Sequence, residues 1–452
     1  MHWLEGSQMT RLYWPRLRSP VFLLYAVDAI LCCAAVYALV LMQNTMPAPR
    51  AIMLAVLVAA TCAFIFAASG LYRTEDFTRT RHLFISATVA TLILLFFLSL
   101  LTFLMPASGS GLIQGLVAVP LIFCAAAITT RLGFSACMRH GVLECRRLAV
   151  IHPDGAGLPT PTAHSWLSGH GHTVALELWQ AELGNTEASV RALRRARIDT
   201  VVMADTEVPD AVRRTCDAAG IAVMDQAEFL ESRHTRVDLE RLAADWLAAA
   251  KANREGAVER SLRRLMDVAL GLFLLLATLP LLILAALAIK LDSPGPVFYC
   301  QERVGQGGRV FRLFKFRSMR VDAEAAGAPV WASKADPRVT RVGRILRLTR
   351  VDEIPQVLNV LRGDMAFVGP RPERPGFVAE LAKAIPHYTD RAVVKPGITG
   401  WAQVNYPYGA SVEDAWMKLT YDLYYVRHRS IFLDLMILIA TVRVVLFQEG
   451  SR

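Results

Sequence analysis

The chain has 452 residues, 54% of them hydrophobic, and a formal net charge of +10. This length suits two or three domains, and the apolar content is high for a soluble protein, so membrane segments are expected. The basic excess is compatible with nucleic acid, anionic lipid or phosphorylated substrates. Apolar segments beside the basic ones favour membrane lipid and phosphates, with no nucleic acid. The eight cysteines form no CxxC pair, which argues against a zinc site or a disulfide framework.

Four apolar segments fill the first third of the chain, each with about the 20 residues that a helix needs to cross a bilayer. They lie at 21–42, 51–72, 84–105 and 111–130. Arginines cluster before the first, between the second and third, and after the fourth, whereas the other two linkers share one arginine. The positive-inside rule places both ends of this bundle in the cytoplasm. We predict a four-helix transmembrane bundle over residues 1–145, with no cleaved signal peptide because no small-residue cleavage site follows the first run.

Residues 146–235 alternate between short apolar runs and a helical stretch. The expected strands are Leu148–Ile151, Thr173–Leu178 and Asp199–Met203, with a helix at Val190–Arg197. This alternation predicts a small Rossmann-like α/β module. The first run leads toward Gly155 and Gly157, where a dinucleotide fold would carry GxGxxG, but the full pattern is absent. A regulatory or assembly role is better supported than a bound nucleotide, and residues 236–260 are expected to form a solvated helical linker.

A fifth apolar run, Val268–Ile289, is long enough to span the membrane. However, residues 301–350 hold twelve Arg or Lys against four acids, which favours the cytoplasmic side. Pro280 lies midway along the run, and a proline kinks a helix because it removes an amide donor. We therefore predict a re-entrant membrane helix at 265–290, with a kinked spanning helix as the alternative. The last apolar run, Ile431–Phe447, is short and carries charges, which favours an interfacial or core helix.

Two β-favouring runs flank Gly305–Gly308, so a strand–turn–strand unit is expected. Its basic side chains include Arg303, Lys315 and Arg317. Arginine holds phosphate oxygens as a fork and lysine as a point charge, so these three are candidate substrate-binding residues. A basic surface that meets anionic headgroups is a compatible interpretation.

Arginines recur at every third position from Arg338 to Arg350, with aliphatic residues between them. On a helix this gives a basic stripe beside an apolar one, which suits the membrane interface. The stripe runs into Asp352 and Glu353, just before Pro355 starts or restarts a helix. Such a pair is usually a solvated face, but here positive charge and a helix N-terminus would hold both carboxylates ionised. One carboxylate could attack phosphorus, while another carboxylate binds the divalent cation that screens phosphate charge.

Two stiff loops follow this acidic pair. Prolines on both sides fix the backbone of Arg371, so its guanidinium suits a phosphate or the polar groups of a nucleotide. A structural arginine in a tight turn is an equal alternative. Trp401 lies at the centre of the second loop, where it is either an interfacial anchor or a packing residue.

Six motifs follow one another in the last part of the chain. They are Ser-Pro-Gly-Pro-Val-Phe, Gln-Glu-Arg-Val-Gly, Phe-Lys-Phe-Arg-Ser-Met, Asp-Glu-Ile-Pro-Gln-Val-Leu-Asn-Val-Leu-Arg-Gly-Asp-Met, Val-Gly-Pro-Arg-Pro-Glu and Lys-Pro-Gly-Ile-Thr-Gly-Trp-Ala-Gln-Val-Asn. Through them, residues 261–452 resemble the bacterial sugar transferases, or monotopic polyprenyl-phosphate phosphoglycosyl transferases. The bundle and α/β module look like the larger members. Arg-Pro-Glu-Arg-Pro, with Asn-Tyr-Pro-Tyr-Gly-Ala-Ser-Val-Glu-Asp, looks like the branch that initiates exopolysaccharide.

The resemblance implies a catalytic pair at Asp352 and Glu353. Asp352 would attack the β-phosphate of a UDP-sugar, expel UMP and form a phosphosugar–aspartyl intermediate, from which undecaprenyl (polyprenyl) phosphate takes the phosphosugar. The resemblance also implies Mg²⁺ as a cofactor near Asp352, Lys315 as the lysine of the Lys-Phe motif, and Arg371 near the nucleotide. Whether Glu353 is a base or a metal ligand stays open.

One motif departs from the family pattern. The usual Ser-Pro helix break is Leu279-Pro280 here, so the hydrogen bond from the serine to a freed carbonyl is missing. Another residue, such as Thr278, would have to supply it.

The expected fold is an α-helical membrane bundle, a Rossmann-like α/β module, and a mixed α/β catalytic domain at 261–452 with a re-entrant membrane helix. The resemblance implies a multi-pass protein of the bacterial inner membrane, its catalytic domain on the cytoplasmic face, using UDP-glucose or UDP-galactose. Two other functions remain: a non-catalytic scaffold or chain-length regulator, and a direct glycosyltransferase that releases UDP. The intact Asp352–Glu353 motif argues against the scaffold. The sugar, a homo-oligomeric state and any ligand of the module stay open.

Overall fold

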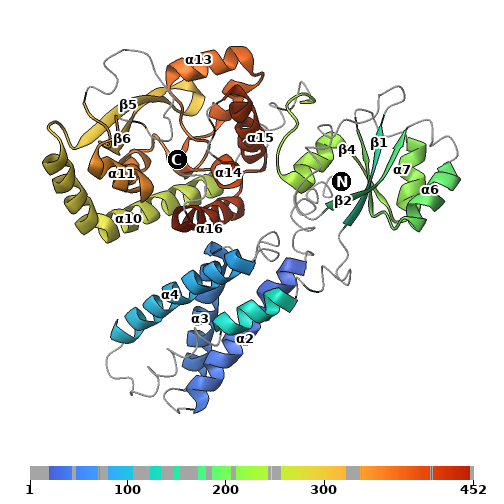
Figure 1. Cartoon of the computed structure of the whole chain (residues 1–452), viewed down its shortest axis with the longest axis horizontal. Coiled ribbons are helices and arrows are strands. Elements are labelled where there is room, and N and C mark those ends of the chain that lie inside the picture. The colour runs from blue at the N-terminus through green and yellow to red at the C-terminus, as the bar shows by residue number, and fades with distance from the viewer. Residues whose placement is uncertain are drawn as a thin grey trace. The chain divides into compact units, whose positions relative to one another are not determined.

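The computed structural model describes residues 20–42, 47–69, 71, 80–104, 123–133, 136, 146–152, 172–179, 186–204, 210–242, 246, 256–321, 336, 338–407, 409 and 411–447. The chain divides into two compact units, Met1–His234 and Thr235–Arg452. The first unit holds long apolar helices and a parallel sheet, and the second holds mixed α/β structure (Figure 1).

Long apolar helices form the start of the first unit. They are α2 (Pro20–Met42), α3 (Ala48–Ala68), α4 (Thr80–Leu104) and a helix at residues 123–133. Small residues such as Ala55, Ala87 and Ala90 let these helices pack closely in one shared core. The first three expected helices are found, and residues 111–122 of the fourth lie outside the described residues. Of this unit, α3 is long and apolar enough to cross a membrane, and a spanning role for the whole bundle stays a prediction.

A buried ion pair joins two of these helices. Arg131 donates to both carboxylate oxygens of Asp28 and, through Nε, to the carbonyl of Leu71 at 3.1 Å. The Arg131 and Asp28 side chains are only 0% and 9% exposed. Because an unpaired buried charge costs several kcal/mol, this pair fixes how the two helices meet. From the sequence, Arg131 was interpreted only as a flanking positive charge.

A four-stranded parallel sheet forms the core of the α/β module. Its strands are β1 (Arg146–His152), β2 (His172–Trp179), β3 (Thr200–Met203) and β4 (Ala222–Asp225), in the order β2-β1-β3-β4, with α6 (Thr186–Arg195) before β3 and α7 (Asp210–Ala218) before β4. Parallel neighbours require such crossover connections. The three expected strands and the helix are confirmed, while β4 and α7 were not predicted. Gly155 and Gly157 lie outside the described residues, and the Rossmann-like assignment stays a prediction.

The first unit ends in α8 (Gln226–Phe229) and a π-helical turn, η3 (Leu230–His234). The described residues 235–242 that follow are irregular. Val237 and Leu239 are buried in the core of the second unit. The solvated helical linker expected at 236–260 is therefore wrong for this stretch, because its apolar side chains dock on the core.

The second unit is built around one main apolar core. Strands β5 (Phe298–Val304) and β6 (Val310–Phe316) form an antiparallel hairpin, while β7 (Ala366–Val368) and β8 (Gly397–Thr399) are a parallel pair. The helices are α10 (Ala257–Asp292), α11 (Arg341–Leu348), α12 (Val357–Arg362), α13 (Pro375–Ala384), α14 (Trp401–Asn405), α15 (Val412–His428) and α16 (Ile431–Phe447), with 3-10 turns η4 (Gln306–Gly308), η5 (Val351–Gln356) and η6 (Tyr388–Val393). The hairpin confirms the expected strand–turn–strand unit. Buried Leu433 and Ile437 make α16 part of the core.

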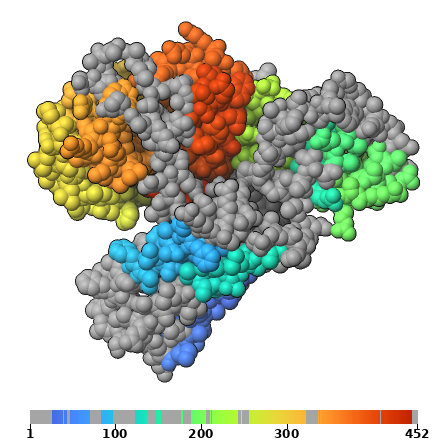
Figure 2. Space-filling view, in the orientation of Figure 1, coloured from blue at the N-terminus to red at the C-terminus, as the bar shows by residue number. Residues whose placement is uncertain are grey.

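Helix α10 contains the whole segment predicted to be re-entrant. Figure 1 shows the helix bending between its end beside α16 and its end beside β5. It is long and apolar enough to cross a membrane. Many of its apolar side chains face outward, including Phe273 and Leu276, which are 67% and 73% exposed. The yellow atoms of Figure 2, from this part of the chain, form an open face of the second unit. Such an apolar face suits lipid, and a return to the same membrane side stays a prediction.

Pro280 lies inside α10 and cannot donate to the carbonyl of Leu276, four residues earlier. Thr278 was the expected substitute donor. Its Oγ1 instead donates to the carbonyl of Leu274 at 2.7 Å. Bonding of this kind favours a helix bend. Thr278 therefore supports the bend without reaching the carbonyl whose partner Pro280 removes.

Charged residues fasten the N-terminal part of α10 to the core. Arg263 pairs with Asp434 of α16, and both are buried. Arg264 donates to two carbonyls at the end of α12, at 2.6 and 2.7 Å, and Asp267 accepts from an amide of β7 at 3.0 Å. The apolar helix is thus fixed to the segments that follow Asp352.

Candidate active site

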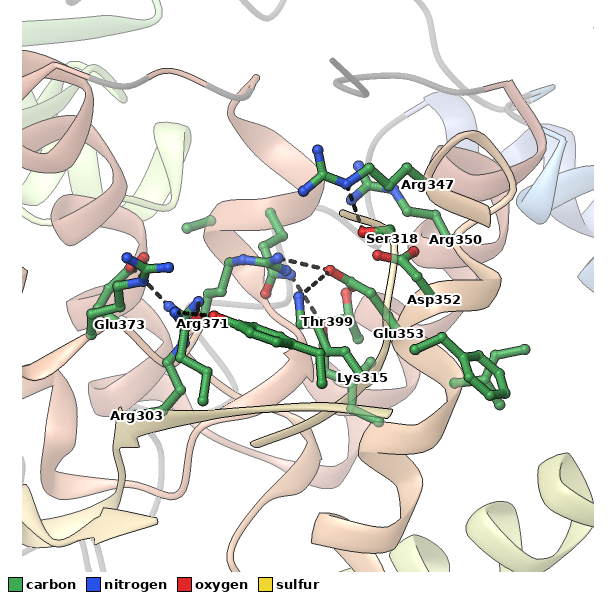
Figure 3. Close-up of a pocket in the computed structure, with 18 of the residues that line it drawn as sticks. Arg303, Lys315, Ser318, Arg347, Arg350, Asp352, Glu353, Arg371, Glu373 and Thr399 are labelled. Atoms are coloured by element: carbon green, nitrogen blue, oxygen red, sulfur yellow. Dashed lines mark hydrogen bonds and ion pairs between the residues drawn. The ribbon is translucent and has the colours of Figure 1, made fainter. Parts of the chain in front are cut away.

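A cavity of about 820 Å³ opens in the second unit. All six predicted site residues line it: Arg303, Lys315, Arg317, Asp352, Glu353 and Arg371. They come from the β5–β6 hairpin, from η5 and from the turn after β7. Figure 3 shows the part of the cavity around the acidic pair.

The acidic pair occupies η5, between α11 and α12. Arg350, just before η5, adopts a left-handed φ of 58°, which turns the chain at the end of α11. Pro355 is buried in the turn and α12 begins at Val357, so a helix restarts as predicted. Asp352 and Glu353 therefore lie just before the N-terminus of a helix.

Glu353 is held by two cations. Its Oε1 accepts from Lys315 Nζ at 3.0 Å and from Arg371 at 2.8 Å, as the dashed lines in Figure 3 show. Burial acts to raise the pKa of Glu353, but the charges of Arg371 and Lys315 outweigh it and hold this pKa well below its ordinary value. Burial lowers the pKa of Lys315, and the Glu353 carboxylate opposes that effect. Glu353 is thus ionised at neutral pH and aligns both cations.

Asp352 lies in different surroundings from its neighbour. It is 7% exposed, and its Oδ1 is buried with no hydrogen-bond partner among the described residues. Burial and the Glu353 carboxylate raise the pKa of Asp352 to about 6, against the opposing charges of Lys315 and Arg347. At neutral pH this carboxylate is ionised but poorly solvated, which suits attack on phosphorus or binding of a cation.

The turn that carries Arg371 is held at four consecutive carbonyls. Each carbonyl accepts a hydrogen bond from another element: Pro370 from the Gly397 amide at 3.0 Å, Arg371 from the Arg391 guanidinium at 3.0 Å, Pro372 from the Arg303 guanidinium at 3.0 Å, and Glu373 from the Val304 amide at 2.9 Å. The stiff display of Arg371 expected from its flanking prolines is therefore confirmed. Its side chain, 33% exposed, reaches Glu353 in the cavity.

Arg303 does not join the Glu353 cluster. One terminal nitrogen donates to the carbonyl of Pro372, and the other donates to Gln301 Oε1 at 2.7 Å. The first also lies 3.6 Å from the Glu373 carboxylate. These contacts favour a brace for the Arg371 turn, and the expected role in substrate binding stays a prediction.

Arg317 lies in the cavity wall but points to the end of α10. Its guanidinium donates to the carbonyls of Ser293 and Pro294 at 2.7 and 2.8 Å, and it is 5% exposed. Gly295 beside it has a φ of 125°, and a Cβ there would overlap the guanidinium. The contacts indicate that Arg317 caps α10, and its expected role in substrate binding stays a prediction. Arg317 directly follows β6, and the alternation of strand side chains does not reveal which element it meets.

The basic stripe is helical only over α11. Arg344 and Ile345 are exposed on this helix, so one side is both basic and apolar, as predicted. Arg347 turns inward, and its Nε donates to Ser318 Oγ at 3.1 Å. Figure 3 shows this arginine beside Asp352. The stripe therefore supplies both an outer surface and a cation for the cavity.

Trp401 is a packing residue. It is 5% exposed, its Nε1 donates to the carbonyl of Thr235 at 3.0 Å, and its ring stacks on Tyr424. The interfacial-anchor interpretation is therefore wrong.

A second polar group in the cavity wall was missed from the sequence: Glu373, Tyr388, Arg391, Lys418 and Asp422. Asp422 of α15 pairs with Arg391 at 2.7 Å and is only 2% exposed. The available signal was an acid placed among the apolar residues of a helix, where burial demands a partner.

The fit for Mg²⁺ depends on Asp352. No group of three or more His, Cys, Asp or Glu residues that could hold a metal occurs in the described part of the chain. Mg²⁺ often uses only one or two carboxylates, with water and substrate phosphates as its other ligands. The partnerless Oδ1 of Asp352 fits such a site, whereas Glu353 is engaged by two cations. Metal dependence stays a prediction.

Comparison with known proteins agrees with this geometry. A family model described as bacterial sugar transferase matches residues 258–448, which include the whole cavity lining. The chain is also 42% identical over 186 residues to the exopolysaccharide production protein PSS of Rhizobium leguminosarum, which covers 40% of this chain and 93% of that protein. The chain belongs to the bacterial sugar transferase family. The resemblance expected from the motifs is thus confirmed.

Longer relatives match over part of their length. The chain is 40% identical over 237 residues to the UDP-N-acetylgalactosamine-undecaprenyl-phosphate N-acetylgalactosaminephosphotransferase of Aeromonas hydrophila, which covers 52% of this chain and 55% of that protein. It is 46% identical over 194 residues to the undecaprenyl-phosphate glucose phosphotransferase of Komagataeibacter xylinus. This match covers 42% of this chain and 36% of that protein. The chain therefore spans about half or less of the length of these two bacterial sugar transferase relatives.

Proposed function

We propose that this bacterial sugar transferase moves a sugar 1-phosphate from a UDP-sugar to undecaprenyl phosphate and releases UMP. The observation that carries the proposal is the contrast within η5: Asp352 is buried with a partnerless oxygen, beside a Glu353 that aligns Lys315 and Arg371. The names of the relatives, which include undecaprenyl phosphate, support the same reaction class. A role in exopolysaccharide synthesis is supported by the name of the Rhizobium relative.

In the proposed first step, the Asp352 carboxylate attacks the β-phosphorus of the donor. A bond forms between the aspartyl oxygen and phosphorus, and the bond to the oxygen that bridges to the α-phosphorus breaks, so UMP leaves with that electron pair. Lys315 and Arg371 place positive charge where negative charge develops on phosphate oxygens. Mg²⁺ held by Asp352 would supply further screening of the diphosphate charge.

In the second step, a phosphate oxygen of undecaprenyl phosphate attacks the same phosphorus. The aspartyl–phosphorus bond breaks, Asp352 returns as a carboxylate, and the lipid leaves as a diphosphate-linked sugar. The acceptor must reach the cavity from a bilayer. The exposed apolar face of α10 supports a cavity near the membrane, and the basic stretch at 301–350 supports the cytoplasmic side of the bacterial inner membrane.

Glu353 has a separate proposed role. A carboxyl with a pKa well below its ordinary value is a poor proton acceptor at neutral pH. We therefore assign Glu353 to alignment of Lys315 and Arg371 rather than to general-base catalysis.

The test is a screen of donors with the purified full chain, undecaprenyl phosphate and Mg²⁺. The panel contains UDP-glucose and UDP-galactose, the two donors expected from the resemblance, and UDP-N-acetylgalactosamine, which one relative's name gives. We expect one or more donors to yield UMP and none to yield UDP, with Asp352→Asn as the inactive control. Release of UDP would indicate direct glycosyl transfer, and no release with any donor would favour the scaffold.

A further inference from the structure

A buried ion pair lies behind the turn that carries Arg371. The Arg391 guanidinium of η6 is 2.7 Å from the Asp422 carboxylate of α15, and the two side chains are 13% and 2% exposed. Arg391 also donates to the Tyr388 hydroxyl at 2.9 Å, and its guanidinium carbon lies 5.3 Å from the centre of that ring. The position of this guanidinium is thus fixed from two sides.

The same guanidinium reaches the turn itself. A terminal nitrogen of Arg391 donates to the carbonyl of Arg371 at 3.0 Å, and Arg371 donates to Glu353 at 2.8 Å. A continuous line of polar contacts therefore runs from Asp422 in α15 to Glu353 in η5. Because both neighbours of Arg371 are prolines, the turn has few amide donors of its own, and donors from other elements must hold it.

Stability alone does not explain this pair. A buried Arg–Asp pair is often no more stable than apolar residues of similar size, because its attraction must offset the loss of hydration. A guanidinium, unlike an apolar group, can hold a backbone carbonyl at a defined distance and direction. The pair is better explained by the geometry that it imposes on the Arg371 turn.

We propose that Arg391 and Asp422 are positioning residues for donor binding: Asp422 holds the Arg391 guanidinium, and Arg391 fixes the carbonyl of Arg371 so that the Arg371 side chain stays aligned beside Glu353 for the donor diphosphate. This inference rests on the proposed function. It requires Arg391 to act through Arg371, so the two residues should not contribute independently.

A double-mutant cycle tests that requirement. Arg391→Lys keeps the charge but loses the planar fork, and we expect it to lower kcat/KM for the active UDP-sugar roughly 10-fold, mostly through KM. Arg371→Ala should lower it further, and the double variant should match Arg371→Ala alone. Independent losses that multiply in the double variant would overturn the proposal.

If Arg391→Lys does not fold, a milder variant tests the same proposal. Tyr388→Phe keeps the ring and removes one acceptor of the Arg391 guanidinium. We expect a loss of roughly 3-fold in kcat/KM that disappears in the Arg371→Ala background. A loss that persists there would contradict action through Arg371.

Asp434→Asn is the matched control for Asp422→Asn. It breaks another buried Arg–Asp pair of the same unit, Arg263–Asp434, whose side chains are 5% and 1% exposed. Both variants should lower the melting temperature, but only Asp422→Asn should raise KM for the donor. If both variants raise KM equally, the effect of Asp422→Asn is a general consequence of weakened folding, and the proposal is overturned.

The proposed function and this inference fail in different ways. If the wild-type chain releases no UMP with any donor, the proposed function fails. The affinity of the same four proteins for UDP is then measured by titration calorimetry. Weaker UDP binding by Arg391→Lys that is absent in the Arg371→Ala background would still support positioning. Unchanged UDP binding by Arg391→Lys would overturn it.

Discussion

Asp352 and Glu353 are consecutive in η5, yet their carboxyl groups have opposite electrostatic surroundings. Burial and the Glu353 charge raise the pKa of Asp352 to about 6. For Glu353, burial is outweighed by Arg371 and Lys315, which hold its pKa well below the ordinary value. One carboxylate is therefore satisfied by two cations, while the other keeps an oxygen without a partner. This difference supports Asp352 as the nucleophile and Glu353 as the aligning residue.

The first step should slow on acidification. Asp352 must be ionised to attack, so labelling of the chain by the donor should fall as pH drops through about 6, approaching tenfold per pH unit below that pKa. The rate should be measured without acceptor, because a phosphate monoester itself titrates near pH 6. A rate that is unchanged between pH 7.5 and pH 5 would contradict an Asp352 nucleophile with a raised pKa.

Asp352→Asn should abolish activity without loss of stability above pH 6. A carboxyl whose pKa is raised by folding weakens the fold as pH rises from its unfolded pKa to its folded one, because the unfolded state releases its proton first. The amide avoids this penalty. Thermal melting should therefore show the variant at least as stable as wild type at pH 8, with the difference narrowing below about pH 6. A clearly lower melting temperature at pH 8 would count against the buried, partnerless carboxylate.

Glu353→Gln should destabilise the chain by roughly 2 kcal/mol, because it leaves Lys315 and Arg371 without their shared anion. The pKa of Glu353 is depressed by folding, so its stabilisation is present above the unfolded pKa and is lost as pH falls through the folded pKa. Denaturant unfolding at several pH values measures this. Glu373→Gln is the control: Glu373 is 30% exposed and 3.6 Å from Arg303, so its loss should cost under about 1 kcal/mol. An equal loss of stability in Glu353→Gln and Glu373→Gln would contradict the stabilising role of Glu353 between Lys315 and Arg371.

Substitution of Arg317 should affect stability, whereas substitution of Arg371 should affect donor binding. Arg317→Lys loses contacts with the carbonyls at the end of α10, so we expect a lower melting temperature and an unchanged KM for the donor. Arg371→Lys should do the reverse, with KM raised roughly 10-fold and little change in melting. Steady-state kinetics and thermal melting of the two variants decide this. A raised KM for folded Arg317→Lys would restore the substrate-binding role first expected for this residue.

The proposed topology can be checked with single cysteines. Lys383 is exposed at the end of α13, and Arg50 is exposed near the start of α3. In a chain without native cysteines, Lys383→Cys should resist a membrane-impermeant maleimide in intact cells, whereas Arg50→Cys should react, because only the second is expected outside. Labelling of Lys383→Cys in intact cells would contradict a re-entrant α10 and support the kinked spanning helix instead.

Residues within the ordered motifs were predictable from the sequence. Asp352, Glu353, Lys315 and Arg371 were predicted as site residues from their motifs and from the family resemblance, and all four line one cavity. The helical bundle, the parallel strands and the β5–β6 hairpin follow from hydrophobic period and turn residues. These features are local, so a single stretch of sequence carries each of them.

Features that depend on contact between distant segments were not predictable. The role of Arg317 depends on where α10 ends, which strand period does not reveal. The Arg391–Asp422 pair joins two elements whose sequences carry no shared pattern. The helical linker was wrong over residues 236–242, because burial of Val237 and Leu239 outweighed the helix-favouring composition around them. Tertiary packing decides all three.

The most direct test of the central claim is covalent labelling by a UDP-sugar that carries ³²P in its β-phosphate. The full chain is incubated with an active donor and Mg²⁺, without acceptor, and is then separated on a denaturing gel. We predict label on wild type that undecaprenyl phosphate removes as lipid-linked sugar, and none on Asp352→Asn. Persistent label on Asp352→Asn, or UMP release by wild type with no labelled protein, would contradict the aspartyl intermediate.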